Sequence, residues 1–222
     1  MTDPIPPLEM TLDELRAALA PLIAANAVFD GWSERARADA AATLGIPADR
    51  ARLAFPGGAA DMIDSWYATI DRGMEERLPA TALAVMKFRD RIRSMVLARL
   101  DIALPQREAA RRAVATLALP RNLLRGVQLG WRTADRMWRL AGDRATDFNH
   151  YSKRATLAGI YAATLMVWLD DESEGQADTS AFLDRRIDGV MRFEKAKARL
   201  KPDGFRHFSP TRLLGRLRYP EA

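Results

Sequence analysis

Apolar residues recur every three to four positions along almost every long segment of the chain, which is the period of an amphipathic helix. Runs rich in Val, Ile and Thr, which would indicate strands, do not occur in the sequence. The sequence also indicates where helices begin: Thr11 and Glu14 have the spacing of a capping box, and Ser33 is placed to cap a second helix. The pattern therefore predicts an all-α fold of about nine or ten helices.

The expected helices follow from this periodicity and from Pro and Gly breaks. They cover Leu12 to Asn26, Ser33 to Leu44, Pro47 to Ala54, Ala59 to Arg77, Ala82 to Leu100, Pro105 to Leu117, Pro120 to Ala141, Phe148 to Asp171 and Thr179 to Leu200, with a short last helix from Pro210. The helix from Phe148 has apolar residues over so broad a surface that we expect it to lie centrally in the fold.

Composition narrows the possible functions. The 222 residues are 48% hydrophobic, which is enough for a large core, and the lack of cysteine excludes disulfides, thiolate nucleophiles and zinc-thiolate sites. No apolar run reaches the length of a membrane span, and residues 1–8 have neither the basic nor the apolar region of a signal peptide. We therefore expect a cytoplasmic protein.

The sequence contains no recognisable catalytic motif. The acidic runs Glu75-Glu76 and 170–172 place neighbouring carboxylates on different helix faces, and Glu-x-x-His repeats do not occur. Gly57-Gly58 lacks the Lys and Ser or Thr of a phosphate-binding loop. We expect no enzymatic activity, no metal and no cofactor. A helical enzyme with a metal or cofactor is a further alternative, which metal analysis of the purified protein would reveal.

Positive charge is concentrated at the C-terminal end. Residues 192–222 hold nine basic and three acidic residues, a net charge of +6, whereas the rest of the chain sums to −1. Leucines alternate with arginines after Phe208, which is the composition of a helix that lies on an anionic membrane surface. The expected membrane-binding residues are Phe208, Arg212, Leu213, Leu214, Arg216, Leu217 and Arg218. Packing of this tail on the body is the alternative.

The first 58 residues have the order of a helix-turn-helix unit and resemble the DNA-binding head of TetR-type regulators. The short third helix offers only Arg50 and Arg52, beside Asp49, so we expect no nucleic-acid binding. The alternative is a TetR-type transcriptional regulator that senses an apolar effector. It predicts DNA affinity that falls steeply with salt and is lost on Arg50→Ala.

Four groups of short motifs resemble the coenzyme Q (ubiquinone) biosynthesis family numbered nine, in its bacterial form. They occupy residues 29–33, residues 55–59, residues 133–154 and residues 182–187. The resemblance implies a TetR-like fold without DNA binding, a pocket for isoprenoid quinone intermediates, dimerisation, and a C-terminal amphipathic helix that touches the membrane. It also implies an assisting role toward the demethoxy-quinone hydroxylase. The implied partner-binding residues are Asn149, His150, Tyr151 and Arg154, with His150 where a Trp is common.

A polyprenyl quinone requires a long apolar cavity, and Met and Trp side chains suit a pliable lining. Ordinary core packing is the alternative reading of the same residues. The candidates on the middle helices are Met62, Trp66, Met86, Met95, Val127, Trp131, Met137, Leu157, Tyr161, Leu165 and Met166.

We therefore expect a helix-turn-helix-like head over residues 1–58, a lipid-binding helical body over residues 59–200 and a basic tail over residues 201–222. The expected function is that of an accessory protein that binds an isoprenoid quinone or other apolar lipid. It would act at the inner face of a membrane as a peripheral homodimer and present the lipid to the hydroxylase.

Overall fold

The computed structural model describes residues 9–143 and 148–200. Within these ranges the chain forms ten α-helices, α1–α10, and no strand, which confirms the all-α prediction. The chain divides into two compact units, residues 1–184 and residues 185–222.

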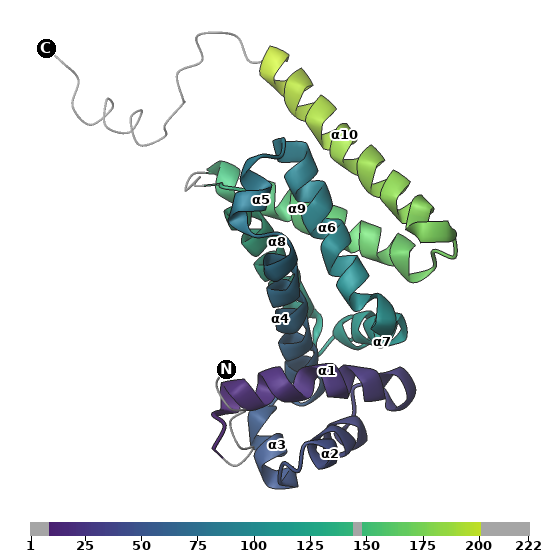
Figure 1. Cartoon of the computed structure of the whole chain (residues 1–222). Coiled ribbons are helices and arrows are strands. Elements are labelled where there is room, and N and C mark those ends of the chain that lie inside the picture. The colour runs from purple at the N-terminus through teal and green to yellow at the C-terminus, as the bar shows by residue number, and fades with distance from the viewer. Residues whose placement is uncertain (1–8, 144–147, 201–222) are drawn as a thin grey trace, which may run out of the picture. The chain divides into compact units, whose positions relative to one another are not determined.

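The head consists of α1 (Leu12–Asp30), α2 (Glu34–Thr43) and α3 (Ala48–Ala54), which pack on one another (Figure 1). The predicted capping box is confirmed, because the Glu14 amide donates to the Thr11 hydroxyl at 3.3 Å and the Thr11 amide donates to the Glu14 carboxylate at 2.7 Å. Ser33 caps α2 by accepting from the Ala36 amide. Local sequence therefore fixes where the first two helices begin.

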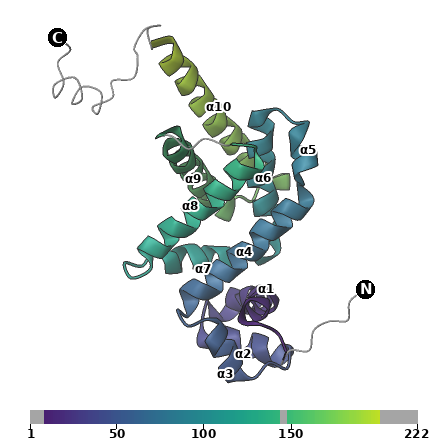
Figure 2. The same ribbon diagram turned by 90° about the vertical axis from the view of Figure 1, so that its left-hand side faces the viewer.

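The long helix α4 (Ala59–Arg77) runs from the head into the body (Figures 1 and 2). The rings of Trp32 and Trp66 lie 5.4 Å apart where the two parts meet. The Trp32 indole donates to the Ala109 carbonyl at 3.0 Å, and the Trp66 indole donates to the Gln106 side chain at 2.9 Å. Because both buried indole N–H groups have acceptors, the contact between head and body leaves neither of them unsatisfied.

The body is formed by α4 together with α5 (Ala80–Ala84), α6 (Phe88–Ala103), α7 (Arg107–Leu117), α8 (Leu123–Leu140) and α9 (Phe148–Leu169), with a 3₁₀ turn at Leu104–Gln106. Helix α9 packs against α6, α7 and α8, and α4 packs against α6 and α8. The core of the body is apolar along most of its length.

Three predicted boundaries were wrong. The expected helix Ala82 to Leu100 is divided into α5 and α6 by a turn at residues 85–87. Helix α1 continues past Asn26 and ends before Gly31, whose φ of 67° is a conformation that favours glycine. The helix expected from Pro120 begins instead at Leu123, after a turn at residues 118–122.

Helix α9 is less central than its composition predicted. One face is buried through Arg154, Leu157, Tyr161 and Trp168, in the i, i+3, i+7 pattern of a helix covered on one side. The opposite face carries an exposed stripe, which we call the α9 stripe: Ala155, Gly159, Ala162 and Met166. The apolar surface that the sequence shows is therefore divided between the core and an uncovered face.

Helix α10 (Ala177–Leu200) begins in the first unit and continues into the second. Its first turn is held by Asp171, whose carboxylate accepts from the Thr179 amide at 2.8 Å and from the Ser173 amide at 2.8 Å. Burial raises the pKa of Asp171, but the hydrogen bonds from Ser173 and Thr179 outweigh it and hold that pKa well below its usual range. The short helix expected from Pro210, and the predicted membrane-binding residues, lie outside the described residues.

Candidate partner and ligand surfaces

The start of α9 is fastened to α8 by a buried arginine. Arg154 is 2% exposed, and its guanidinium donates to Asp135 at 2.5 Å, to Asp143 at 3.2 Å and to the His150 carbonyl at 3.1 Å. Asp135 also pairs with Arg139 at 2.8 Å, and Asp143 with Lys153 at 2.8 Å. The network satisfies a charge that would otherwise be costly to bury, and it fixes the first turns of α9 against α8.

An aromatic cluster adjoins this network. The Trp138 indole donates to the Lys153 carbonyl at 3.0 Å, and the Lys153 ammonium lies 5.3 Å from the centre of the Trp138 ring. The Trp138 ring also stacks on Phe88 of α6, with the ring centres 5.1 Å apart. The cluster therefore joins α6, α8 and α9 at the end of the body.

Tyr151 lies at the surface beside this fixed turn. Its side chain is 61% exposed, and its ring lies 6.0 Å from Trp131 and 5.2 Å from His150. Val127 and Leu124 are exposed on α8, four and seven residues before Trp131, so they continue the face on which Trp131 lies. We call these four residues, Leu124, Val127, Trp131 and Tyr151, the α8–α9 patch.

The structure separates the predicted partner-binding residues by position. Tyr151 is exposed, His150 is partly exposed, and Asn149 lies in the first turn of α9. Arg154 is inside, where it positions the turn that carries Tyr151 and does not reach the surface. Sequence reasoning did not identify its partners Asp135 and Asp143, since an acid nineteen or eleven residues away gives no local signal.

The predicted lipid-lining residues fall into three groups. Met62, Trp66, Met95, Met137, Leu157 and Tyr161 are buried in the core of the body. Met86, Trp131 and Leu165 are partly exposed. Val127 and Met166 are surface residues, 63% and 52% exposed. The structure thus buries six candidates on α4, α6, α8 and α9, and it places Val127 and Met166 at the surface.

A charged pair is buried among these apolar side chains. Arg99 of α6 and Asp71 of α4 form an ion pair with both side chains fully buried, and Arg136 lies 3.8 Å from the same carboxylate. The Arg99 guanidinium also lies 5.1 Å from the centre of the Tyr161 ring.

Burial, with a smaller effect of Tyr161, raises the pKa of the Tyr67 phenol well above its usual range, so Tyr67 stays protonated.

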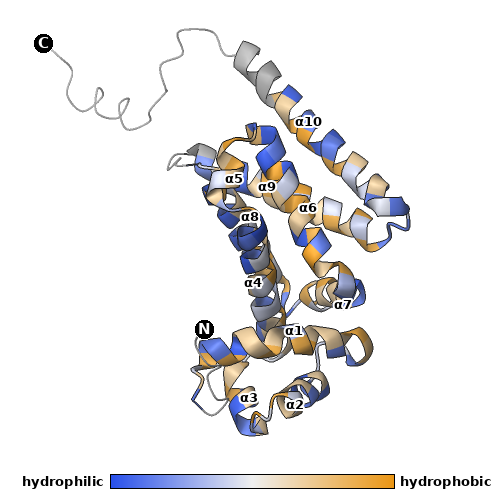
Figure 3. Ribbon diagram, viewed as in Figure 1, coloured by the Kyte–Doolittle hydropathy of each residue, from blue (hydrophilic) through white to orange (hydrophobic). Residues whose placement is uncertain are grey.

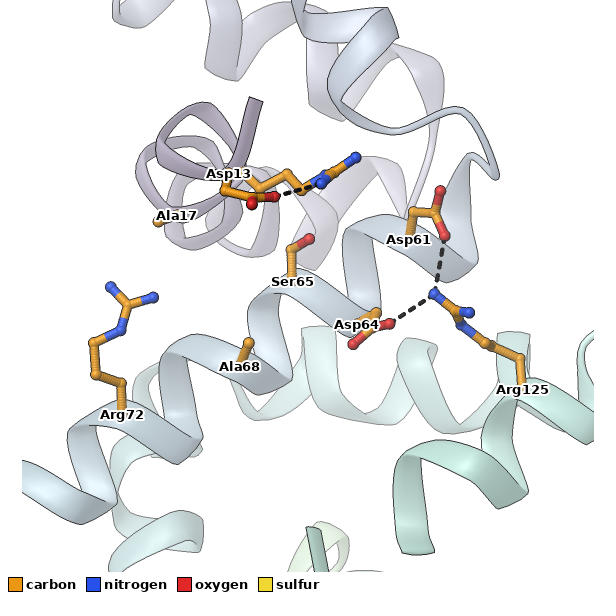
Figure 4. A pocket seen from close by; sticks show the side chains of 9 residues that line it. Asp13, Ala17, Asp61, Asp64, Ser65, Ala68, Arg72 and Arg125 are labelled. Carbon is orange, nitrogen blue, oxygen red and sulfur yellow. Dashed lines mark hydrogen bonds and ion pairs between the residues drawn. The ribbon is translucent and has the colours of Figure 1, made fainter. Parts of the chain in front are cut away.

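Two polar clefts lie along α4. The first, about 480 Å³, is lined from α1, α4 and α8, and Figure 4 shows Arg125 bridging Asp61 and Asp64 at its edge. The second, about 430 Å³, is lined by Glu75 and by the α8 residues Arg132, Asp135, Arg136, Arg139 and Leu140. None of the predicted lipid-lining residues borders either cleft.

Ion pairs join α4 to α8, and Figure 3 shows hydrophilic colour on the upper part of α4. Arg132 pairs with Asp64, and Arg136 pairs with Glu75. This seam is therefore polar.

The arginines of the head differ in exposure. Arg50 of α3 donates to the Met10 carbonyl at 2.6 Å, whereas Arg52 is 71% exposed and lies 3.9 Å from Asp49. In α2, Arg37 is buried and pairs with Glu34. Helix α3 has only seven residues.

Comparison with known proteins identifies the relatives of this chain. The COQ9 family model matches residues 124–194, the stretch that contains the α8–α9 patch and the Arg154 network. Two mitochondrial ubiquinone biosynthesis proteins named COQ9 align over 180 residues and 78% of the chain, the rat protein at 33% identity and the human protein at 31%. The chain is a relative of the COQ9 proteins. The family resemblance inferred from the motifs is thereby confirmed.

The aligned region makes up 58% of the rat COQ9 protein and 57% of the human one, so the chain spans somewhat more than half of these relatives. A crystal structure of a TetR transcriptional regulator from Nitrosomonas europaea matches with a TM-score of 0.65 and 26% identity, over 80% of this chain and 98% of that one. The TetR-like fold is therefore confirmed.

Among the helices of residues 9–143 and 148–200, none combines the length and apolar composition that a bilayer span requires.

Proposed function

We propose that the chain is an accessory protein of ubiquinone biosynthesis. It binds an isoprenoid quinone precursor and presents it to the demethoxy-quinone hydroxylase at a membrane surface. The observation that carries the proposal is the 33% identity over 180 residues with a protein named for ubiquinone biosynthesis. The test is the quinone profile of cells that lack the chain. Accumulation of the demethoxy precursor is expected, and an unchanged profile would refute the role.

The ligand step is supported by the buried Met and Trp side chains of the body, which can repack around a flexible prenyl chain. Purified protein from a quinone-producing host should release an isoprenoid lipid on organic extraction, and native mass spectrometry should show the same added mass. Recovery of protein without any lipid would count against binding.

The partner step is assigned to the α8–α9 patch. An exposed aromatic residue on a rigid turn loses little conformational entropy on binding, and Tyr residues are enriched among interface hot spots. Tyr151→Ala should weaken hydroxylase association by about thirtyfold, since a hot-spot truncation costs about 2 kcal/mol. Phe29→Ala is the matched control, because Phe29 is an exposed aromatic residue of the head, 82% exposed.

Equal affinity of the Tyr151→Ala variant and the parent protein would exclude the patch. An equal loss in both variants would mean that the measured association does not use this surface. Circular dichroism should be the same for all three proteins, because neither side chain is buried.

The homodimer is proposed to form along the α9 stripe. Ala155, Gly159 and Ala162 allow close approach of a second helix, and Met166 continues the same face at helical spacing. Ala162→Arg should convert a dimer to a monomer in sedimentation velocity, whereas Tyr151→Ala should leave the dimer intact. A monomeric parent protein, or a dimer insensitive to Ala162→Arg, would remove this assignment.

Membrane docking is proposed for the basic residues and leucines after Phe208. Flotation with anionic vesicles should fall when residues 205–222 are deleted, and unchanged flotation would show that this segment is not the anchor. The rat relative is named as a mitochondrial protein, which is compatible with a function at a membrane surface.

A regulator that binds DNA is the other candidate, favoured by the likeness to a TetR transcriptional regulator. The hydrogen bond of Arg50 to the Met10 carbonyl weighs against it, since phosphate contacts need available cations. A gel-shift assay with the DNA upstream of the chain's own gene distinguishes the regulator from the accessory protein. Salt-sensitive, sequence-specific binding that Arg50→Ala abolishes would replace the accessory role.

A further inference from the structure

The turn between α5 and α6 is held rigid while its tip is uncovered. The Arg91 guanidinium donates to the carbonyls of Met86 at 3.0 Å, Ala84 at 3.0 Å and Ala141 at 2.8 Å. These bonds fix the backbone of residues 84–88 against the end of α8. Val85, at the tip, is 88% exposed.

Phe88 extends this uncovered surface. It is 41% exposed, although one side of its ring stacks on Trp138. Ala84 and Lys87 are exposed between and beside these two residues. The result is an apolar tip with a cation next to it, at the end of the body away from the head (Figures 1 and 2).

The charged residues within the segment are basic. Residues 77–89 contain Arg77, Lys87 and Arg89 and no acid, and the side chains of Arg77 and Lys87 are exposed. Arg89 pairs with Asp184 at 3.2 Å, and the acids Glu76 and Asp90 lie just outside the segment, so Lys87 is the exposed cation at the tip. An apolar tip flanked by cations is complementary to an anionic lipid surface, where headgroup phosphates lie just outside the acyl chains. A carbonyl that already accepts a hydrogen bond within the protein costs less free energy to remove from water. In this turn Arg91 donates such bonds to the carbonyls of Met86 and Ala84.

We propose that the α5–α6 turn, residues 84–88, is a membrane contact of the body that inserts Val85 and Phe88 into the interface of an anionic bilayer. The inference rests on the proposed work of the protein at a membrane, and it adds a contact separate from the segment after residue 205. It orients the end of the body toward the lipid phase from which an isoprenoid ligand would enter.

The absence of cysteine in the chain allows a site-specific test. The full chain with Val85→Cys, labelled with the environment-sensitive fluorophore NBD, is mixed with vesicles of phosphatidylglycerol and phosphatidylcholine, and flotation is measured in the same sample. The matched control is Leu53→Cys with the same label, since Leu53 is an exposed aliphatic residue of α3. We expect a blue shift and quenching by nitroxide-labelled lipid at position 85 and neither at position 53.

The outcomes separate the two proposals. Flotation with an unchanged probe at position 85 overturns the turn contact and leaves membrane docking intact. No flotation at all overturns both. A response of both probes, or an equal response on phosphatidylcholine alone, shows embedding that is not specific to an anionic contact and also overturns the inference.

A second pair of variants tests the energetics without a label. Val85→Asp should lower vesicle partitioning about tenfold, because the apolar side chain no longer leaves water and a negative charge faces the lipid phosphates. Leu53→Asp should have no effect. If Val85→Asp abolishes hydroxylase association and leaves partitioning unchanged, the turn is a protein contact and the membrane assignment is wrong.

Discussion

Arg154 provides the sharpest test of how the start of α9 is held. Replacement by Met keeps the length of the side chain and removes the guanidinium, which is buried and bonded to Asp135, Asp143 and the His150 carbonyl. Breaking a buried ion pair by removing one partner costs about 3–5 kcal/mol. Asp135 keeps Arg139 and Asp143 keeps Lys153, so we expect the lower end, about 3 kcal/mol.

Lys153→Met is the matched comparison, because Lys153 lies in the same turn and contacts the same Asp143. Its side chain is 38% exposed, and an ion pair in such a position contributes about 0.5 kcal/mol. The double variant should lose about 1 kcal/mol more than the sum of the two, since each cation compensates Asp143 when the other is absent.

Chemical denaturation followed by far-UV circular dichroism measures these differences, and thermal midpoints give a second reading. For a chain of this size, a loss of about 3 kcal/mol should lower the midpoint by roughly 6–12 °C. A loss below about 0.5 kcal/mol for Arg154→Met, or equal losses for both single variants, would refute the argument that burial decides the contribution. Hydroxylase association should also weaken in Arg154→Met, because the turn that carries Tyr151 is no longer fixed.

Three further predictions concern the core, the start of α10 and a turn. Met137→Ala should destabilise the body by about 2–5 kcal/mol because Met137 is fully buried, whereas Val127→Ala should stay within about 0.5 kcal/mol because Val127 is exposed. Equal losses in urea unfolding would contradict the assignment of core and surface. Asp171 has a lowered pKa, so its stabilisation is present above about pH 4 and is lost as the pH falls through the folded-state pKa. Asp171→Asn should be less stable at neutral pH by about 2 kcal/mol and lose less on acidification, and an unaltered pH profile would exclude this role. Gly58→Ala should cost at least about 1 kcal/mol in the same assay, because Gly58 has a φ of 62°, and a neutral result would mean that the turn before α4 adapts.

Local signals in the sequence determined a large part of the fold. The capping box at Thr11, the cap at Ser33 and the bounds Ala59–Arg77 of α4 agree with the structure. Capping side chains decide where the first two helices begin, and Gly58 and Pro79 bound α4. The four motif groups were enough to recognise the COQ9 relationship, which the 33% identity to the rat protein bears out. The inward-facing members of the lipid-lining set, such as Met62 and Met137, were also visible from periodicity, although their role as a ligand site remains a prediction.

Only the tertiary structure decided the rest. The break between α5 and α6 has no Pro or Gly to announce it, and it exists because Arg91 satisfies carbonyls both in the turn and at the end of α8. The burial of Arg154, which sequence reasoning placed on a partner surface, depends on acids eleven and nineteen residues away. Helical periodicity reports which residues share a face, but which face is covered depends on packing between distant segments, so Val127 and Met166 could not be assigned to the surface until α8 and α9 were placed.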